Sequence, residues 1–195
     1  EAFRVIQRVL IRSGIALLYS QGFNPHPRLS LPLPKSVGLE SEDELFYAQI
    51  ESNESLDSEL YKNLSSQMPA GFVLTNLAIH NGRVSFRPVE VEYLIQMSES
   101  EIRDVSVVAD KLNGLIAAGE KIITERTVDG IGNTKTMDVG QFLKAIETTR
   151  QGIKVVSIIT GRGTVRPDEI IKLLGLGAER LGISMIRKKV GWQMY

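Results

Sequence analysis

Residues 89–119, VEVEYLIQMSESEIRDVSVVADKLNGLIAAG, carry the strongest structural pattern in the chain. The first nine residues alternate in hydropathy, with apolar side chains at Val89, Val91, Tyr93, Ile95 and Met97. Alternation with a period of two predicts a β-strand with one buried face. Ser98 or Ser100 can cap a following amphipathic helix, which the pattern ends at Gly119. A long strand followed at once by a long helix indicates a mixed α and β domain.

The remainder of this half is predicted from shorter patterns. Residues 121–127 and 134–137 indicate a hairpin around Gly130-Ile131-Gly132-Asn133, and Phe142 and Ile146 indicate a short helix within 138–150. A strand, a helix and a last strand are predicted at 154–160, 167–174 and 183–190. We interpret this half as a ferredoxin-like unit, β-α-β-β-α-β, that carries an inserted hairpin or helix.

The first half gives a related order. The spacing of its apolar residues predicts helices at 1–13 and 57–68 and strands at 15–19, 45–50 and 72–79. The order α-β-β-α-β becomes the same motif if one strand precedes Glu1. The sequence therefore predicts an α+β fold of two tandem ferredoxin-like (βαββαβ) units with antiparallel sheets, at 1–87 and 88–195, the first lacking its first strand. A doubly wound parallel sheet is the alternative.

Composition narrows the possible functions. The 195 residues hold 23 Lys and Arg against 23 Asp and Glu, so the net charge is zero and any anion site must be a local patch. The chain has no cysteine, which excludes disulfides, thiolate zinc sites and an iron–sulfur cluster held by this chain. No apolar run approaches the roughly 18 residues that a membrane span needs, and no signal peptide is visible. We therefore expect a cytoplasmic protein without a membrane partner.

Residues 20–28, SQGFNPHPR, form the most informative segment and are called the proline loop below. Pro25 and Pro27 restrict the backbone around His26. The loop therefore loses little further conformational entropy when its polar side chains bind a ligand. His26 is the candidate acid or base, Arg28 suits a phosphate or carboxylate, and Phe23 suits stacking. The predicted binding residues here are Ser20, Gln21, Gly22, Phe23, Asn24, His26 and Arg28. The alternative is a loop that merely turns the chain, with Phe23 in the core and His26 bonded to a carbonyl.

The proline loop and the residues after it resemble a known family. Residues 19–34, YSQGFNPHPRLSLPLP, and 37–42, VGLESE, are similar to the signature of the radical-SAM-linked family, a domain of unknown function catalogued as DUF2344. The resemblance implies a radical SAM protein as partner, which would use S-adenosylmethionine and an iron–sulfur cluster, while this chain binds no cofactor. Two departures stand out: a His-Leu-Asp stretch common in the family lies upstream of Glu1, and Gly140-Gln141 stand where the family has an Arg-Pro pair.

Two further segments are candidate anion sites. Residues 160–167, TGRGTVRP, precede a predicted helix, where backbone amides with Arg162 and Arg166 can bind a phosphate, although a simple Gly-Arg-Gly turn is the alternative. Arg187, next to Lys188 and Lys189, belongs to a possible RNA-facing patch or to a strand edge kept soluble by charge. His80 is interpreted as a turn residue, and the acidic residues 40–44 as a solvated run.

Three functions remain open. The first is a non-catalytic accessory module that recognises an RNA or protein substrate and presents it to a radical SAM partner. The second is a small enzyme acting on a phosphorylated or nucleotide-like compound, which requires His26, Arg28 and another polar group to converge in a pocket. The third is a dimerising or docking domain.

Overall fold

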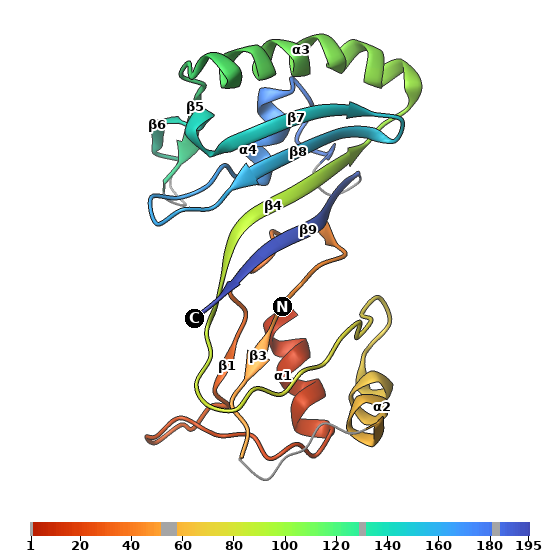
Figure 1. Ribbon diagram of the computed structural model, residues 1–195, viewed down its shortest axis with the longest axis vertical. Helices are drawn as coiled ribbons and strands as arrows, with labels where there is room; N and C mark the ends of the chain where they lie inside the picture. The colour runs from red at the N-terminus through yellow and green to blue at the C-terminus, as the bar shows by residue number, and fades with distance from the viewer. Residues whose placement is uncertain (1, 52–57, 129–131, 181–183) are drawn as a thin grey trace. The chain divides into compact units, whose positions relative to one another are not determined.

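The computed structural model describes residues 2–51, 58–128, 132–180 and 184–195 (Figure 1). The chain divides into two compact units. Unit 1 comprises Glu1–Pro34, Leu45–Phe86 and Met194–Tyr195, and unit 2 comprises Lys35–Glu44 and Arg87–Gln193. Both units mix helices and strands, so the α+β class is confirmed. No helix in the described part of the chain is both long and apolar enough to span a bilayer.

Unit 2 is built on a five-stranded sheet. Its strands, in spatial order, are β2 (Glu40–Ser41), β9 (Met185–Met194), β4 (Phe86–Gln96), β8 (Gly152–Ile158) and β7 (Leu143–Thr149). Strand β8 pairs antiparallel with both β4 and β7, whereas β2 pairs parallel with β9. This mainly antiparallel pairing shows that the doubly wound parallel alternative is wrong. The predicted strands at 89–97, 154–160 and 183–190 are confirmed as β4, β8 and β9, with Ile183 outside the described residues.

The helix predicted after β4 is confirmed in detail as α3 (Glu99–Ala118), which lies along β7 and β8 (Figure 1). Ser98 and Glu101 form a capping box: the Ser98 N–H donates to Glu101 Oε2 at 2.8 Å, and the Ser98 hydroxyl accepts from the Glu101 N–H. Gly119 ends the helix in the left-handed conformation, with φ +67°. Local sequence alone determines both ends of this helix.

The region after α3 contains one correct and one wrong prediction. The hairpin is confirmed as β5 (Ile123–Thr127) and β6 (Thr134–Asp138), while residues 129–131 of its loop lie outside the described residues. The helix predicted within 138–150 is wrong: a single 3-10 turn, Gly140–Phe142, leads into β7. A β-bulge between Leu143 and Ala145 inserts one residue, so buried side chains fall three or four residues apart and imitate a helix.

Helix α4 (Pro167–Leu173) confirms the helix predicted at 167–174. Proline occupies the first turn, where a missing N–H costs nothing, and the Arg166 N–H donates to Glu169 Oε2 at 2.7 Å. Ile170 and Ile171 are buried, so this short helix is held by packing rather than by its own length.

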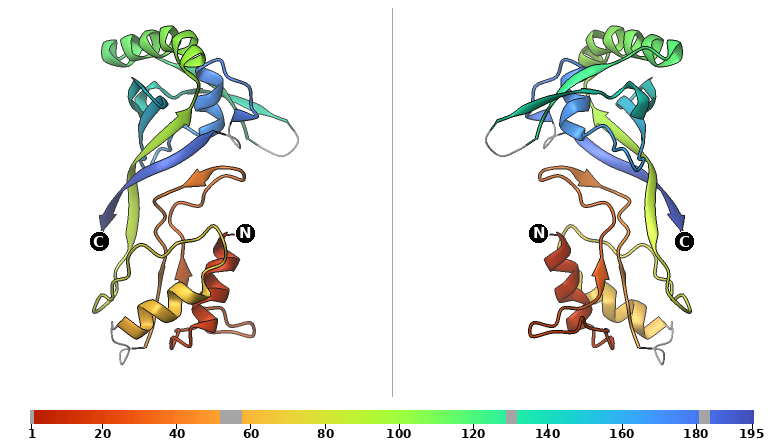
Figure 2. Two further views of the ribbon diagram at one scale, coloured as in Figure 1. Left: turned by 90° about the vertical axis from the view of Figure 1, so that its right-hand side faces the viewer. Right: turned by 90° about the vertical axis from the view of Figure 1, so that its left-hand side faces the viewer.

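Unit 1 is smaller and holds α1 (Ala2–Arg12), α2 (Ser58–Gln67) and a two-stranded sheet of β1 (Leu29–Ser30) and β3 (Tyr47–Ala48) (Figure 2). Its buried core consists of Ile6, Val9, Leu10, Leu17 and Leu64. The predicted helices at 1–13 and 57–68 are confirmed within the described residues, which exclude Glu1 and Asp57.

The strands predicted in unit 1 are only partly present. Residues 15–19 form isolated bridges, Leu17 with Ile50 and Tyr19 with Pro27, instead of a continuous strand. The strand predicted at 72–79 is wrong, because this segment forms no ladder within the described chain. Phe72, Leu74 and Leu77 pack against the core of unit 1, and the Tyr61 hydroxyl donates to the Leu74 carbonyl at 2.7 Å.

Candidate functional site

The base of the proline loop is a closed cycle of three backbone hydrogen bonds. The Arg28 N–H donates to the Leu18 carbonyl at 2.8 Å, the Leu18 N–H to the Gln49 carbonyl at 2.8 Å, and the Gln49 N–H to the Arg28 carbonyl at 2.9 Å. The Arg28 side chain adds a bond from Nη1 to Gln49 Oε1 at 3.1 Å. Three separate chain segments are therefore joined at the root of the loop, which fixes its direction.

A second set of bonds closes the loop above this base. The Ser20 N–H donates to the His26 carbonyl at 2.8 Å, and the His26 N–H donates to the Ser20 hydroxyl at 3.0 Å. Gly22, at the turn, has φ +130°, a backbone conformation that other residues rarely adopt. Proline, serine and glycine thus hold the loop in one shape.

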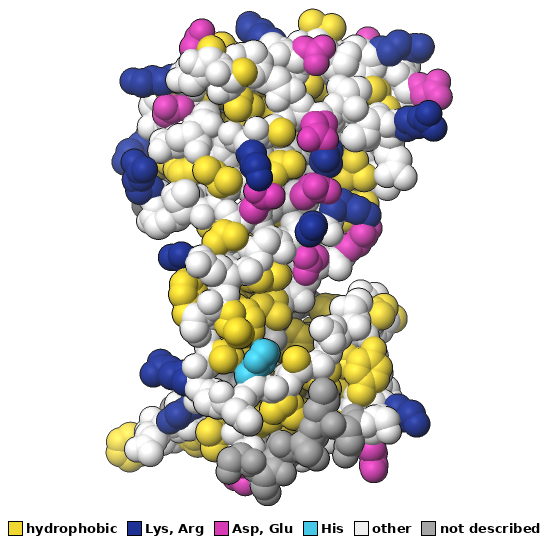
Figure 3. All heavy atoms as spheres, in the orientation of Figure 1, with side chains coloured by type: hydrophobic (Ala, Val, Ile, Leu, Met, Phe, Trp, Pro, Cys, Tyr) yellow, Lys and Arg dark blue, Asp and Glu magenta, His cyan; other side chains and the backbone are white. Residues whose placement is uncertain are grey.

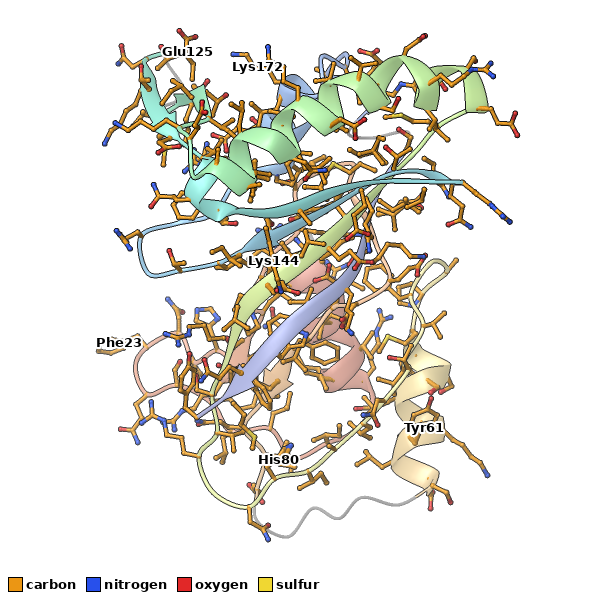
Figure 4. The ribbon with its side chains drawn as sticks, turned by 45° about the horizontal axis from the view of Figure 1, so that its top comes forward. Phe23, Tyr61, His80, Glu125, Lys144 and Lys172 are labelled. Atoms are coloured by element: carbon orange, nitrogen blue, oxygen red, sulfur yellow. The ribbon has the colours of Figure 1, made fainter. Side chains whose placement is uncertain are left out.

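The tip of the loop faces solvent. Gln21, Gly22, Asn24, Pro25 and His26 are exposed, and Phe23 has a relative exposure of 106%. In Figure 4 the Phe23 ring points outward from the loop. The alternative that places Phe23 in the core is therefore wrong. A large aromatic side chain presented on a braced loop has the form of a recognition element.

His26 and Arg28 do not form a catalytic pair in this arrangement. The His26 imidazole is exposed and has no hydrogen-bond partner within the described residues, so the carbonyl bond of the structural alternative is absent there. The Arg28 guanidinium contacts the Gln49 side chain instead. The other histidine, His80, packs edge-on against Phe86, with the ring centroids 6.1 Å apart. No group of three or more potential metal-binding side chains is found among the residues described.

The second candidate segment, residues 160–166, is called the glycine turn below. The Thr160 N–H donates to the Gly163 carbonyl at 2.9 Å, the Gly163 N–H donates back to Thr160 at 3.0 Å, and the Arg162 N–H donates to the Thr160 hydroxyl at 3.2 Å. The Arg166 N–H is used by Glu169. These amides are satisfied inside the protein, so the structure favours the simple turn over a phosphate cradle. The Arg162 and Arg166 side chains are exposed beside it, and Arg166 Nη1 donates to the Thr127 carbonyl at 3.3 Å.

An ion pair between Arg126 and the buried Glu169 is hydrogen-bonded to the glycine turn. Arg126 Nε donates to Glu169 Oε1 at 2.6 Å, and Arg126 Nη2 donates both to Glu169 Oε2 and to the Thr164 carbonyl at 2.7 Å. Burial raises the pKa of Glu169, but hydrogen bonds from Arg126 and from the Arg166 N–H, with the charge of both arginines, outweigh it. The pKa of Glu169 is therefore lowered, and the carboxylate is ionised when the turn is formed.

Arg187 is not part of an exposed patch. Its relative exposure is 2%, and Nη1 pairs with Glu44 Oε1 at 2.7 Å. Burial raises the pKa of the neighbouring Tyr93, and the charge and hydrogen bond of Arg187 only partly oppose this. A guanidinium enclosed in this way cannot contact RNA. The prediction of an RNA-facing patch at Arg187 is therefore wrong.

The acidic residues 40–44 are largely exposed, as interpreted from the sequence, but several of them are paired with β9. Glu40 and Ser41 form β2 beside β9, Glu42 pairs with Lys188, and the Asp43 carboxylate accepts the Val190 N–H at 2.8 Å. Acidic and basic runs that lie far apart in the sequence therefore neutralise one another along this side of unit 2. Both signals had been interpreted separately because their pairing is not local.

The sheet of unit 2 also carries balanced charge. Lys154 lies 2.5 Å from Glu147 and 4.0 Å from Glu92, and Lys144 lies 2.5 Å from Glu90. In Figure 3, acidic and basic side chains are interspersed over this part of the molecule. An open hollow of about 360 Å³ is lined by Glu92, Lys154 and Lys188 among others. Its lining also includes Arg150, while Lys154 and Lys188 are paired with Glu147 and Glu42.

Helix α1 carries a set of residues that the sequence reasoning had passed over. Arg4, Arg8 and Arg12 are all exposed, on the side of the helix away from the buried Ile6 and Val9. Their spacing of four residues was a usable signal, because residues four apart share one face of a helix.

The fold and these surfaces define a mixed α+β protein with a hydrogen-bonded loop whose tip is exposed. The family described as "Uncharacterized protein conserved in bacteria (DUF2344)" matches residues 1–167, and the chain belongs to this family. No curated protein and no solved structure matches the chain.

Proposed function

We propose that the chain is a non-catalytic recognition domain that binds a macromolecular substrate through the proline loop and presents it to a radical SAM partner. The observation that carries the proposal is the full exposure of Phe23 on a loop whose base is closed by three backbone hydrogen bonds. In this proposal the partner holds S-adenosylmethionine and the iron–sulfur cluster, since this chain has no cysteine to ligate one. The absence of cysteine also fits a cytoplasmic location.

Rigidity is what makes the loop suited to recognition. A flexible loop loses conformational entropy when it binds, whereas a loop already held by hydrogen bonds and prolines loses little. Aromatic side chains on such supports are frequent centres of binding energy, because they bury a large area with few rotatable bonds. Phe23 is placed to bury its ring only when a ligand arrives.

The competing enzyme hypothesis has less support. It needs the imidazole of His26 and the guanidinium of Arg28 to converge on one substrate. Arg28 instead bonds Gln49 at the base of the loop, while His26 is exposed above it. A binding role uses both residues as they lie, Arg28 as a brace and His26 as a surface contact.

We also infer that unit 2 is a ferredoxin-like unit, with the β5–β6 hairpin as an insertion. Without this hairpin its order is β4-α3-β7-β8-α4-β9, a βαββαβ sequence. The corresponding spatial order is β9-β4-β8-β7, so the last strand lies beside the first and the third beside the second. A tandem arrangement with unit 1 remains a prediction, since the strand predicted there at 72–79 is not formed.

A site-specific crosslink tests the recognition role. A photo-crosslinking phenylalanine analogue replaces Phe23 in the full-length protein, and Val73, which is 83% exposed in the same unit, serves as the matched control position. We expect position 23 to crosslink in cells to one discrete RNA or protein that position 73 does not capture, and a radical SAM protein to co-purify. Equal, diffuse crosslinking from both positions would contradict the proposal. A crosslink to a second copy of the chain would instead establish a dimerising domain.

A further inference from the structure

The outward side of α1 is a continuous arginine face. Arg4, Arg8 and Arg12 repeat every four residues, so each is displaced from the previous one by about 6 Å along the helix and by a small rotation. All three are exposed, while Ile6, Val9 and Leu10 on the other side are buried in the core. The arginine face is therefore held in place by packing that does not involve the arginines.

No ion pair among the residues that the structure describes neutralises this face. Residues 2–34 contain Arg4, Arg8, Arg12 and Arg28 and not a single Asp or Glu. The ion pairs of the described residues all lie in unit 2, and none includes an α1 arginine. Like charges four residues apart slightly destabilise a helix, so this arrangement does not help α1 to fold.

We propose that the arginine face of α1 binds the phosphates of a single-stranded RNA. This inference rests on the proposed recognition function and names the class of its substrate. Guanidinium groups bind phosphate oxygens in a bidentate manner, and a row of three follows a phosphodiester backbone. Unit 1 also presents Phe23, an exposed ring of the kind on which unpaired bases stack.

Two other anionic surfaces fit less well. Insertion into a membrane surface requires a broad exposed apolar face on the basic helix. In α1, Ile6, Val9 and Leu10 pack in the core of unit 1, and only Phe3 and Ile11 are exposed apolar residues. An acidic protein surface satisfies the charge but gives no use to an isolated aromatic ring on a rigid loop. We therefore commit to RNA and make an acidic polypeptide an arm of the test.

Binding by the full-length protein is measured by fluorescence polarisation with a labelled 20-nucleotide single-stranded RNA at 50 and 200 mM salt. Three phosphate contacts on a single strand give a slope of log affinity against log salt of about −2, from roughly 0.7 per contact. The triple variant Arg4→Gln, Arg8→Gln, Arg12→Gln removes the contacts. We expect it to bind on the order of ten-fold or more weakly at 50 mM salt and to lose about 2 units of slope.

Two variants control for folding and for net charge. The triple Arg→Lys variant at the same positions keeps the charge, and we expect it to retain most of the slope. The variant Arg103→Gln, Lys111→Gln, Lys172→Gln removes three exposed charges from α3 and α4, and we expect affinity and slope to be unchanged. Circular dichroism and thermal unfolding identify any variant that fails to fold, in which case single Arg→Gln variants, each reducing the slope by about 0.7, replace it.

The outcomes separate this inference from the proposed function. An unchanged affinity and slope in the Arg→Gln variant would overturn the arginine face as an RNA site. Equal binding of a 20-residue polyglutamate, with the same loss in the variant, would also overturn it and point to an acidic protein. If the discrete crosslink from position 23 persists in either case, the recognition role of the loop stands without the RNA assignment.

Discussion

The proline loop and the glycine turn are made from similar residues but use them in opposite ways. Both combine glycine with an arginine and connect larger elements, and both were candidate anion sites. In the glycine turn, the amides of Arg162, Gly163 and Arg166 are hydrogen-bonded within the protein. In the proline loop, hydrogen bonds close the base, while the tip from Gln21 to Pro25 faces solvent.

The difference shows that residue type is a weaker sign of function than the use of each polar group. The glycine turn is part of the fold. Arg126 bonds its Thr164 carbonyl, Glu169 accepts its Arg166 N–H, and Arg126 and Glu169 pair with each other. The hydrogen bonds of the proline loop lie at its base and between Ser20 and His26. Its tip residues therefore contribute little to the fold and are available to a ligand. Substitutions at the two loops are therefore expected to separate stability from binding.

The largest effect is expected at Glu169. Glu169→Gln leaves the Arg126 guanidinium, whose side chain is 13% exposed, without its counter-charge. Breaking a buried ion pair from one side costs about 3 kcal/mol or more, so we expect the free energy of unfolding to fall by about 3 kcal/mol. Urea unfolding followed by circular dichroism measures it. Glu125→Gln, an exposed acid on β5, is the control with little expected change; a loss below about 1 kcal/mol at Glu169 would remove the distinction between the loops.

A smaller effect is expected from pH, through the lowered pKa of Glu169. Because this pKa is lower in the folded protein, the carboxylate contributes stability above the ordinary glutamate pKa of about 4.3. That contribution is lost as the pH falls from about 4.3 through the folded pKa, with a slope of up to about 1.4 kcal/mol per pH unit. Unfolding free energies of the wild-type protein and of Glu169→Gln, measured from pH 7 to pH 3, should converge at low pH. Parallel curves would contradict the ionised pair.

The accuracy of the sequence predictions depended on how local each signal was. Strand β4 and helix α3 were predicted well, because alternation, the Ser98 cap and Gly119 all lie within the segment itself. Strand β7 was mistaken for a helix because one bulged residue breaks its alternation. The exposure of the proline loop tip was not predictable, since a string of prolines with Phe23 fits a buried turn as well as a protruding one.

Long-range pairing explains the remaining errors. Arg187 and Glu44 are 143 residues apart, so neither burial nor neutralisation is visible in either segment by itself. The acidic run and the basic strand each matched a common surface pattern, and only the pairing of β2 with β9 shows that they meet. The arginine face of α1 differs from these errors. Its spacing is local and visible in the sequence, but it was not among the candidate sites predicted from the sequence.

The smallest change in stability is expected at Phe23, and it sharpens the contrast most. Because the ring is fully exposed, Phe23→Ala removes no packing, and we expect the free energy of unfolding to change by less than about 0.5 kcal/mol. The same variant should lose most of its binding to the ligand captured at this position, since truncation of an aromatic anchor commonly costs about 2 kcal/mol or more. Unfolding in urea and a binding titration on one preparation measure both quantities. A large loss of stability with unchanged binding would mean that the loop, like the glycine turn, serves the fold.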